Sequence, residues 1–303
     1  MINLQGSLVA IITPMRADGE VDFVALTRLL EFHISEGTHA IVSVGTTGES
    51  STLEVEEHLE VVQHTVKIVN KRIPVVAGTG ANSTKEAIYL TKQAEQAGAD
   101  AALLVVPYYN KPTQEGLYRH FKTIAETVSI PQVLYNVPGR TVADLSNKTI
   151  ARLADIDNII ACKDATGDLQ RGKELIEMCG DKMSILSGDD PTALELMRLG
   201  GRGDISVTAN VAPALMSQMC QAALDGDFDT AALLDQRLSG LHEHLFVESN
   251  PIPVKFAVSK MGYTDNMLRL PLLPLSQVYE EQISLAMERA GVKVKTNNDQ
   301  NNA

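Results

Sequence analysis

Short apolar segments rich in β-branched residues recur along the chain, and they stop at glycine, proline, asparagine or aspartate. Two of them read SLVAIITP and PQVLYNVP, with apolar positions that are continuous rather than alternating. Continuous apolar character is typical of strands covered on both faces, as in a parallel sheet. The pattern predicts eight strands, over residues 7–14, 40–49, 74–80, 99–109, 131–138, 159–168, 184–190 and 203–211.

Amphipathic segments lie between these strands. Residues 22–37 carry Leu26, Leu29 and Leu30 at helical spacing and stop at Gly37, a typical helix end. Ser51 and Glu54 stand in capping-box spacing, which predicts a helix start at residue 51. Eight strands alternating with helices favour an α/β fold of the (β/α)8 TIM-barrel type over an open, doubly wound sheet. The predicted helices cover residues 22–37, 51–70, 83–100 and 191–201.

Strand patterns stop after Val211, and helical patterns continue almost to the end of the chain. We therefore expect a catalytic barrel over residues 1–224 and a C-terminal helical appendage over residues 225–293. Residues 294–303 are polar and low in complexity, which predicts a disordered tail.

Composition narrows the class of protein. Hydrophobic residues make up 44% and charged residues 21% of the chain, as in ordinary soluble domains. A net charge of −12 without a basic stripe argues against a nucleic-acid partner. No segment approaches the ~20 apolar residues of a membrane span, and the N-terminus lacks a signal-peptide pattern. Cys162, Cys179 and Cys220 form no CxxC motif, so we expect free, mostly buried thiols in the reducing cytoplasm.

Lys163 is the strongest candidate for a catalytic residue, because active sites of such barrels lie at the carboxyl ends of the strands. It ends the apolar run IIACK. One interpretation is a solvated lysine that leaves the strand and pairs with Asp164 or Asp168. The other is a buried amine: burial disfavours the ammonium form, and the neutral amine attacks a carbonyl carbon to give an imine.

Hydroxyl groups at other strand ends favour the buried amine. Making and dehydrating a carbinolamine requires proton carriers. Tyr135, connected through Thr46 to Tyr109, could supply such a relay. We therefore expect Lys163 to be a covalent catalyst.

Arg140 in NVPGRT offers a planar fork that suits a substrate carboxylate, although an ordinary surface arginine on a turn is the alternative. The segment GTTGES lacks the phosphate-loop pattern, and its backbone N–H groups are better suited to a carboxylate. GTGANS lacks the third glycine of a dinucleotide fingerprint, so no nucleotide cofactor is expected.

Metal ligands are not expected either. The histidines are scattered, and His242 and His244 are expected on a solvated helix face. Asp189 and Asp190 precede Pro191 and are expected to cap a helix. The carbonyl chemistry therefore looks independent of metal.

Four segments in this order, GTTGES, PYYNKP, YNVPGRT and KDATGD, closely resemble the dihydrodipicolinate synthase family of pyruvate-dependent class I aldolases. The resemblance covers nearly the whole chain and leaves only the final polar tail outside. It implies a lyase that joins pyruvate to L-aspartate 4-semialdehyde, the first committed step toward diaminopimelate and lysine. It also implies no cofactor beyond the imine of pyruvate on lysine, and a homotetramer built as a dimer of dimers.

The resemblance also implies roles for individual residues. Lys163 would form the Schiff base, and Tyr135, Thr46 and Tyr109 would be the proton relay, with Tyr109 reaching from a neighbouring subunit. For the substrates, Thr47 would hold the pyruvate carboxylate, Arg140 would bind the semialdehyde carboxylate, and Gly188 and Ile205 would line the pocket.

Many bacterial members of the family are inhibited by L-lysine at the dimer interface. This sequence has Val55 where some lysine-sensitive relatives carry a histidine, but it keeps polar groups able to hold an amino acid. The matching positions are Ser50, Ser51, His58, Asn82, Glu86 and Tyr108.

Two other functions compete. N-acetylneuraminate lyase and keto-deoxy-sugar-acid aldolases share the lysine and the tyrosine but typically lack the arginine of NVPGR, so Arg140 discriminates against them. A non-catalytic binding barrel is the alternative of another class, and it predicts no reaction of Lys163 with pyruvate.

Overall fold

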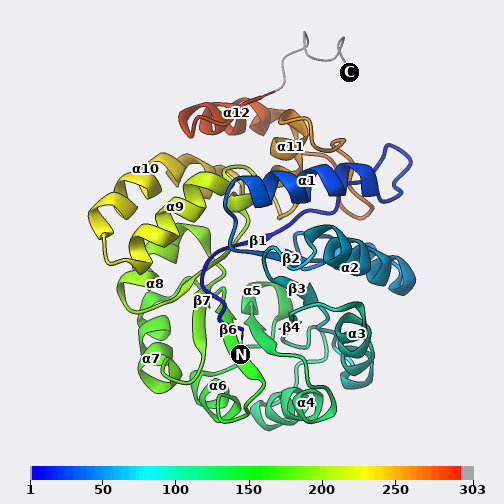
Figure 1. Ribbon diagram of the computed structural model, residues 1–303, viewed down its shortest axis with the longest axis vertical. Helices are drawn as coiled ribbons and strands as arrows, with labels where there is room; N and C mark the ends of the chain where they lie inside the picture. Colours follow the sequence, from blue (N-terminus) through cyan, green and yellow to red (C-terminus); the bar gives the residue numbers. More distant parts are fainter. Residues whose placement is uncertain (1, 295–303) are drawn as a thin grey trace.

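The computed structural model describes residues 2–294 and contains a closed barrel of eight parallel strands in sequence order (Figure 1). Each predicted segment overlaps one strand, so the predicted barrel is confirmed. The strands are shorter than predicted, because each chain segment leaves the sheet before its apolar run ends. Their bounds are β1 Gly6–Ala10, β2 Ala40–Ser43, β3 Val75–Gly78, β4 Ala101–Val105, β5 Gln132–Asn136, β6 Ile159–Asp164, β7 Ser184–Ser187 and β8 Gly203–Ser206.

Helices surround the strands on the outside, as expected for this fold (Figure 1). Side chains of Asp22, Ser83 and Asp168 accept hydrogen bonds from backbone N–H groups in the first turns of α1, α3 and α7. The helices between the strands are α1 Phe23–Ser35, α2 Val55–Val69, α3 Thr84–Ala97, α4 Gln114–Thr127, α5 Pro138–Thr141, α6 Asn147–Leu153, α7 Leu169–Cys179 and α8 Ala193–Arg198.

The predicted helix start at residue 51 is wrong. Glu49 takes up a left-handed conformation, with φ of 57°, and Ser50–Thr52 form a short 3-10 turn before α2 begins at Val55. Glu54 precedes the helix without making a side-chain cap hydrogen bond. The Ser51 and Glu54 spacing therefore belongs to the turn that follows β2, close to the mouth of the barrel.

Alternate residues of the strands fill the barrel interior. Val133 and Tyr135 of β5 belong to one buried cluster with Leu103, Ala161 and Leu186 from three other strands. Side chains two positions apart in a strand share a face, so the residue two positions after Ala161 also faces inward. That residue is Lys163.

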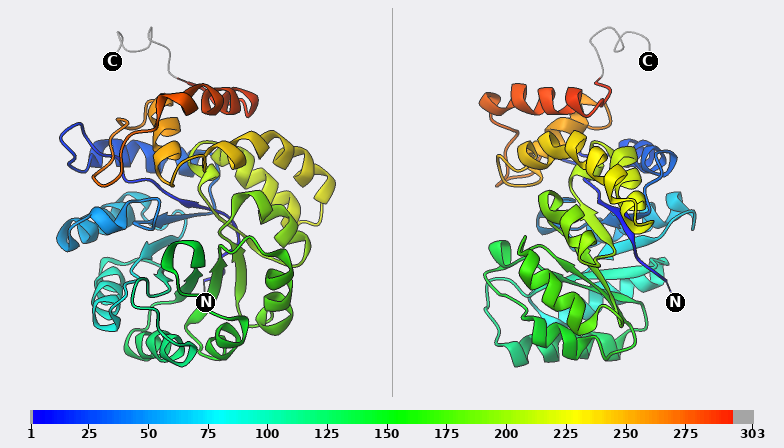
Figure 2. Two further views of the ribbon diagram at one scale, coloured as in Figure 1. Left: turned by 180° about the vertical axis from the view of Figure 1, so that it is seen from behind. Right: turned by 90° about the vertical axis from the view of Figure 1, so that its left-hand side faces the viewer.

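Four further helices lie at the same side of the barrel as α1 (Figures 1 and 2). Leu238, Leu241, Val254 and Ile283 from them join one apolar cluster that includes Leu26 of α1. The division at residue 224 stays a prediction, and the predicted tail falls, from residue 295 on, outside the described residues. These helices are α9 Pro213–Leu224, α10 Phe228–His244, α11 Ile252–Lys260 and α12 Glu280–Arg289.

Cys162, Cys179 and Cys220 are free and buried, as expected. Between residues 2 and 294, no helix is both long and apolar enough to traverse a lipid bilayer.

Candidate active site

Lys163 lies near the carboxyl end of β6 with its side chain inside the barrel, and only 5% of the residue is exposed. Its neighbour in the sheet register is Tyr135 of β5. The Lys163 Nζ atom lies 4.4 Å from the centroid of the Tyr135 ring. The amine is therefore held against an aromatic face at the end of the barrel where strand-to-helix loops begin.

The interpretation of Lys163 as a solvated lysine paired with an acidic neighbour is wrong. The Asp164 carboxylate accepts hydrogen bonds from the backbone N–H and hydroxyl of Thr166, at 3.2 and 3.1 Å. Asp168 instead caps α7. Within residues 2–294, none of the ion pairs involves Lys163.

Thr46 and Tyr135 line the same small cavity, whose volume is about 40 Å³. Tyr135 is buried, and Thr46 belongs to the loop that follows β2. The structure thus brings together two of the three predicted relay residues. Tyr109 does not line this cavity; it is 88% exposed, with φ of 74°.

Gly188 follows β7, and because it has no side chain, the Lys163 side chain can occupy the space beside it. A Cβ atom at this position would lie 2.5 Å from the Lys163 Cε atom and 2.9 Å from the Ala165 Cβ atom. Ile205 of β8 lies in the barrel interior and is 1% exposed. Both predicted pocket residues therefore border the barrel volume that holds the lysine.

The two predicted carboxylate-binding residues meet at a third residue, Asn250. The Asn250 side-chain amide Nδ2 donates to the Thr47 hydroxyl over 3.0 Å. Arg140 Nη2 donates to the Asn250 backbone carbonyl over 3.2 Å. Thr47 is buried and Arg140 is exposed, so the arginine fork stands at the mouth and the threonine stands below it.

A family model described as the dihydrodipicolinate synthetase family matches residues 3–290. The chain belongs to this family. The 4-hydroxy-tetrahydrodipicolinate synthase of Stutzerimonas stutzeri is 59% identical over 289 residues, which cover 95% of this chain and 99% of that protein. This membership confirms the resemblance that the four sequence segments carry.

Solved structures of the same family superpose closely. The chloride-inhibited dihydrodipicolinate synthase from Acinetobacter baumannii, complexed with pyruvate, has a TM-score of 0.95 and 58% identity, over 96% of this chain and 100% of that one. The enzyme from Cyanidioschyzon merolae with lysine bound has a TM-score of 0.92 and 37% identity, over 95% of this chain and 99% of that one. The names of these relatives favour the synthase over the neuraminate lyase alternative.

A second cavity, of about 340 Å³, adjoins the first at Thr46 and carries five of the six positions that the family resemblance assigns to an effector. Burial and the charge of Glu86 raise the pKa of Tyr108. Burial lowers the pKa of His58, whose Nε2 atom lies 2.9 Å from the Gly78 carbonyl. The lining includes Ser50, Ser51, His58, Glu86 and Tyr108, together with Thr46, Val55 and Arg140.

Asn82 is the position that does not line this cavity. Its backbone carbonyl accepts a hydrogen bond from the Asn110 side chain over 2.9 Å.

Sequence reasoning missed the contacts that the C-terminal helices make with the site. Lys255 of α11 is fully buried and forms an ion pair with Glu49, which is 1% exposed on its side chain. The second oxygen of Glu49 accepts from the Arg269 backbone N–H over 3.2 Å. A lysine in the apolar run IPVKFAV was the available signal, because lysine is almost never fully buried without a partner.

Two further expectations about polar residues are wrong. Asp189 stands at the N-cap position of the 3-10 turn Asp190–Thr192 but makes no side-chain cap hydrogen bond. Asp190 makes no helix cap; its buried carboxylate accepts from the Ser206 hydroxyl and from the backbone N–H groups of Val207 and Thr208. His242 is buried rather than solvated, with its Nδ1 atom 2.9 Å from the Thr208 hydroxyl. Within residues 2–294, no three His, Cys, Asp or Glu side chains gather as metal ligands.

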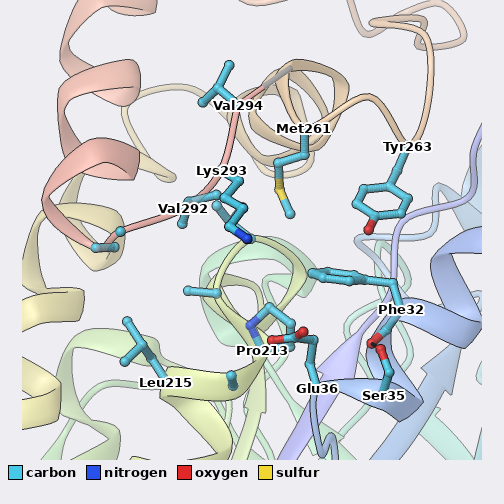
Figure 3. A pocket seen from close by; sticks show the side chains of 15 residues that line it. Phe32, Ser35, Glu36, Pro213, Leu215, Met261, Tyr263, Val292, Lys293 and Val294 are labelled. Atoms are coloured by element: carbon cyan, nitrogen blue, oxygen red, sulfur yellow. Dashed lines mark hydrogen bonds between the residues drawn. The ribbon is translucent and has the colours of Figure 1, made fainter. Parts of the chain in front are cut away.

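Another cavity, of about 870 Å³, lies away from these residues, between α1, α9, α11 and the segment after α12. Figure 3 shows Phe32 and Tyr263 on one side of it and Val292 and Lys293 on the other. The rings of Phe32 and Tyr263 stack with centroids 4.7 Å apart. None of the predicted site residues lines this cavity, so its size does not mark the chemistry.

Proposed function

We propose that this chain is a 4-hydroxy-tetrahydrodipicolinate synthase that condenses pyruvate with L-aspartate 4-semialdehyde through a Schiff base on Lys163. The observation that carries the proposal is a buried lysine without a carboxylate partner among the described residues, whose amine faces Tyr135 at the strand ends. Membership of the dihydrodipicolinate synthetase family supports it. The reaction is the first committed step toward diaminopimelate and lysine.

The geometry supports the following sequence of steps. The Lys163 amine attacks the keto carbon of pyruvate, and the carbinolamine loses water to give an imine. Loss of a proton from the pyruvate methyl group gives an enamine, whose carbon attacks the aldehyde carbon of the second substrate. The product then cyclises through its own amino group and releases Lys163. The protonated imine is the electron sink, so the chemistry requires no separate cofactor.

Hydroxyl groups carry the protons in this proposal. Tyr135 and Thr46, which line one cavity, transfer protons to and from the carbinolamine oxygen. Thr47 holds the pyruvate carboxylate inside the barrel, and Arg140 binds the semialdehyde carboxylate at the mouth through its planar fork. Gly188 and Ile205 shape the space around the imine.

Substrate consumption tests this proposal. The purified protein is expected to consume pyruvate and aspartate 4-semialdehyde in equal amounts, and to release no pyruvate from N-acetylneuraminate. A folded protein that leaves both synthase substrates unchanged would support the binding-barrel alternative. Release of pyruvate from N-acetylneuraminate would support the lyase.

Tyr109 completes the relay from a second subunit in a homotetramer built as a dimer of dimers. Its exposed position outside the cavity of its own chain supports this arrangement. Mixing and refolding the inactive variants Tyr109→Phe and Lys163→Ala tests it. In an equal mixture, half of the dimers contain one subunit of each variant, and one of the two sites in such a dimer has both Lys163 and Tyr109. About a quarter of all sites should therefore be complete, and that share of wild-type activity should return. No recovery from a mixture shown to form dimers would place Tyr109 in its own chain's site.

L-Lysine is the effector of the 340 Å³ cavity. Glu86 is suited to its ammonium group, and the cavity adjoins Thr46, so an occupant there touches the proton relay. Calorimetric titration should show L-lysine binding to the wild type and at least tenfold weaker binding to Glu86→Ala, the loss expected for a charge-assisted contact. The exposed Glu281→Ala on α12 is the control. Absence of heat at millimolar L-lysine would contradict the proposal.

The cytoplasm is the proposed location. Three cysteines that remain free although buried suit a reducing compartment.

A further inference from the structure

Asn250 touches both residues that are proposed to bind substrate carboxylates, but it does so through different groups. Its side-chain amide donates to the Thr47 hydroxyl over 3.0 Å, whereas its backbone carbonyl accepts from Arg140 over 3.2 Å. Asn250 is 7% exposed and Thr47 is 2% exposed, so the contact between them is shielded from water. A substitution of the Asn250 side chain therefore removes one contact and leaves the other in place.

The contact fixes the direction of the Thr47 hydroxyl. A threonine hydroxyl has one hydrogen to donate and two lone pairs that accept. Because Thr47 accepts from Asn250, its hydrogen must point elsewhere, and within residues 2–294 the Thr47 hydroxyl makes no second hydrogen bond. Leaving a buried hydroxyl hydrogen without an acceptor costs free energy, so the Thr47 hydroxyl is available to donate to an oxygen atom of a bound ligand.

Both partners of this contact are held in place. Glu49, two positions after Thr47, forms the buried ion pair with Lys255 of α11. Asn250 lies just before the same helix, which begins at Ile252. The loop that carries Thr47 and the segment that carries Asn250 are thus tied together twice, and neither can shift without disturbing a buried charge pair.

We infer that Asn250 is a positioning residue for pyruvate: its amide turns the Thr47 hydroxyl hydrogen toward the pyruvate carboxylate. This inference rests on the proposed function, because it requires pyruvate to bind beside Lys163. It assigns no contact with substrate to Asn250 itself. Its effect on pyruvate binding is exerted through Thr47. Its side chain has no effect on semialdehyde binding, because Arg140, the proposed partner of the semialdehyde carboxylate, contacts the Asn250 backbone carbonyl and not the side chain.

Steady-state kinetics with each substrate varied in turn test the inference. Asn250→Ala is expected to raise the half-saturating pyruvate concentration about tenfold, the loss typical of a hydrogen bond to a charged group. The half-saturating semialdehyde concentration and kcat should change less than twofold. A merely structural role would shift both substrates together, and that result would overturn the inference.

A double-variant cycle shows whether Asn250 acts through Thr47. Thr47→Val removes the hydroxyl while keeping the shape of the side chain. If the amide acts only by turning that hydroxyl, Asn250→Ala should have no further effect on pyruvate in the Thr47→Val background. Independent, multiplicative effects of the two substitutions would contradict the inference.

Asn266→Ala is the matched control. Asn250 and Asn266 each have a buried side-chain oxygen without a hydrogen-bond partner among the described residues, but Asn266 is hydrogen-bonded to neither Thr47 nor Arg140. Its half-saturating pyruvate concentration should equal that of the wild type. Failure of the wild type to react with pyruvate would defeat the proposed function, whereas an active wild type with an unchanged Asn250→Ala variant would defeat this inference alone.

Discussion

Within residues 2–294, two lysines are buried, Lys163 and Lys255, and they differ in their partners. Lys255 is fully buried and paired with Glu49, whereas Lys163 is 5% exposed and faces the ring of Tyr135 without an ionic partner within residues 2–294. The ion pair of Lys255 with Glu49 compensates two buried charges and connects α11 to the loop after β2. A lysine without a carboxylate keeps its amine available for a carbonyl carbon. The partner, rather than burial alone, separates the structural lysine from the reactive one.

Removing the reactive amine should give the largest effect. Lys163→Met keeps the length of the side chain but cannot form an imine, so synthase activity should fall on the order of 10³-fold or more. The free energy of unfolding should stay the same or rise, because Lys163 forms no ion pair within residues 2–294 whose partner would be left alone. Activity assays and urea denaturation measure the two quantities. A loss of stability with Lys163→Met would break the comparison.

Removing the structural lysine, Lys255, should instead lower the stability and leave imine formation in place. Lys255→Met leaves Glu49 as an unpaired buried carboxylate and should lower the free energy of unfolding by about 3–5 kcal/mol. Imine formation with pyruvate should persist in the folded fraction. Urea denaturation provides the measurement.

The matched control for this change removes both charges. Adding Glu49→Gln to Lys255→Met takes away the stranded carboxylate and should recover most of the lost stability, since a neutral amide can still accept from the Arg269 N–H. Equal stability of the single and double variants would show that packing, rather than charge, explains the role of Lys255.

Filling the space beside Lys163 should slow imine formation. In Gly188→Ala the new Cβ atom would lie 2.5 Å from the Lys163 Cε atom, so the amine must move, and imine formation should slow about 10- to 100-fold. Gly139→Ala, at the same mouth, meets no atom within 4 Å and is the control. Rapid-quench trapping with borohydride measures the rate. Equal rates for the two variants would contradict the placement of Lys163.

A buried histidine gives the smallest of these effects. Burial lowers the pKa of His33 from 6.5 to about 3, so between these values the unfolded chain binds the proton and the folded chain does not. Stability should therefore fall as the pH drops below 6.5, by about 2 kcal/mol at pH 5 from this residue. His33→Gln should flatten that slope in urea denaturation across pH 4–7. An unchanged slope would mean that His33 is protonated in the folded state.

The sequence alone predicts the barrel and most of the mouth, because both depend on local signals. Continuous apolar runs located all eight strands, and polar residues at their ends located Lys163, Tyr135 and Thr46. Strand ends were placed too late because apolar residues continue into the loops. Local spacing also misled at Ser51, where a left-handed Glu49 and a 3-10 turn precede the helix.

Contacts between distant segments could not be predicted. Asn250 and Thr47 are 203 positions apart, and Lys255 and Glu49 are 206 apart, so no periodic pattern connects them. The partners of His242 and Asp190 depend likewise on how α10 and β8 pack. The proposed role of Tyr109 depends on a second subunit, which one chain's pattern does not describe.

Peptide mapping after reduction tests the central claim most directly, because it compares the two buried lysines in one protein. The wild type is incubated with pyruvate and borohydride, digested and analysed by mass spectrometry. We predict a single adduct, with the mass of pyruvate minus water plus two hydrogens, on the peptide that contains Lys163 and none on the peptide that contains Lys255. An unmodified Lys163 in the folded protein, or an adduct on Lys255, would contradict the account.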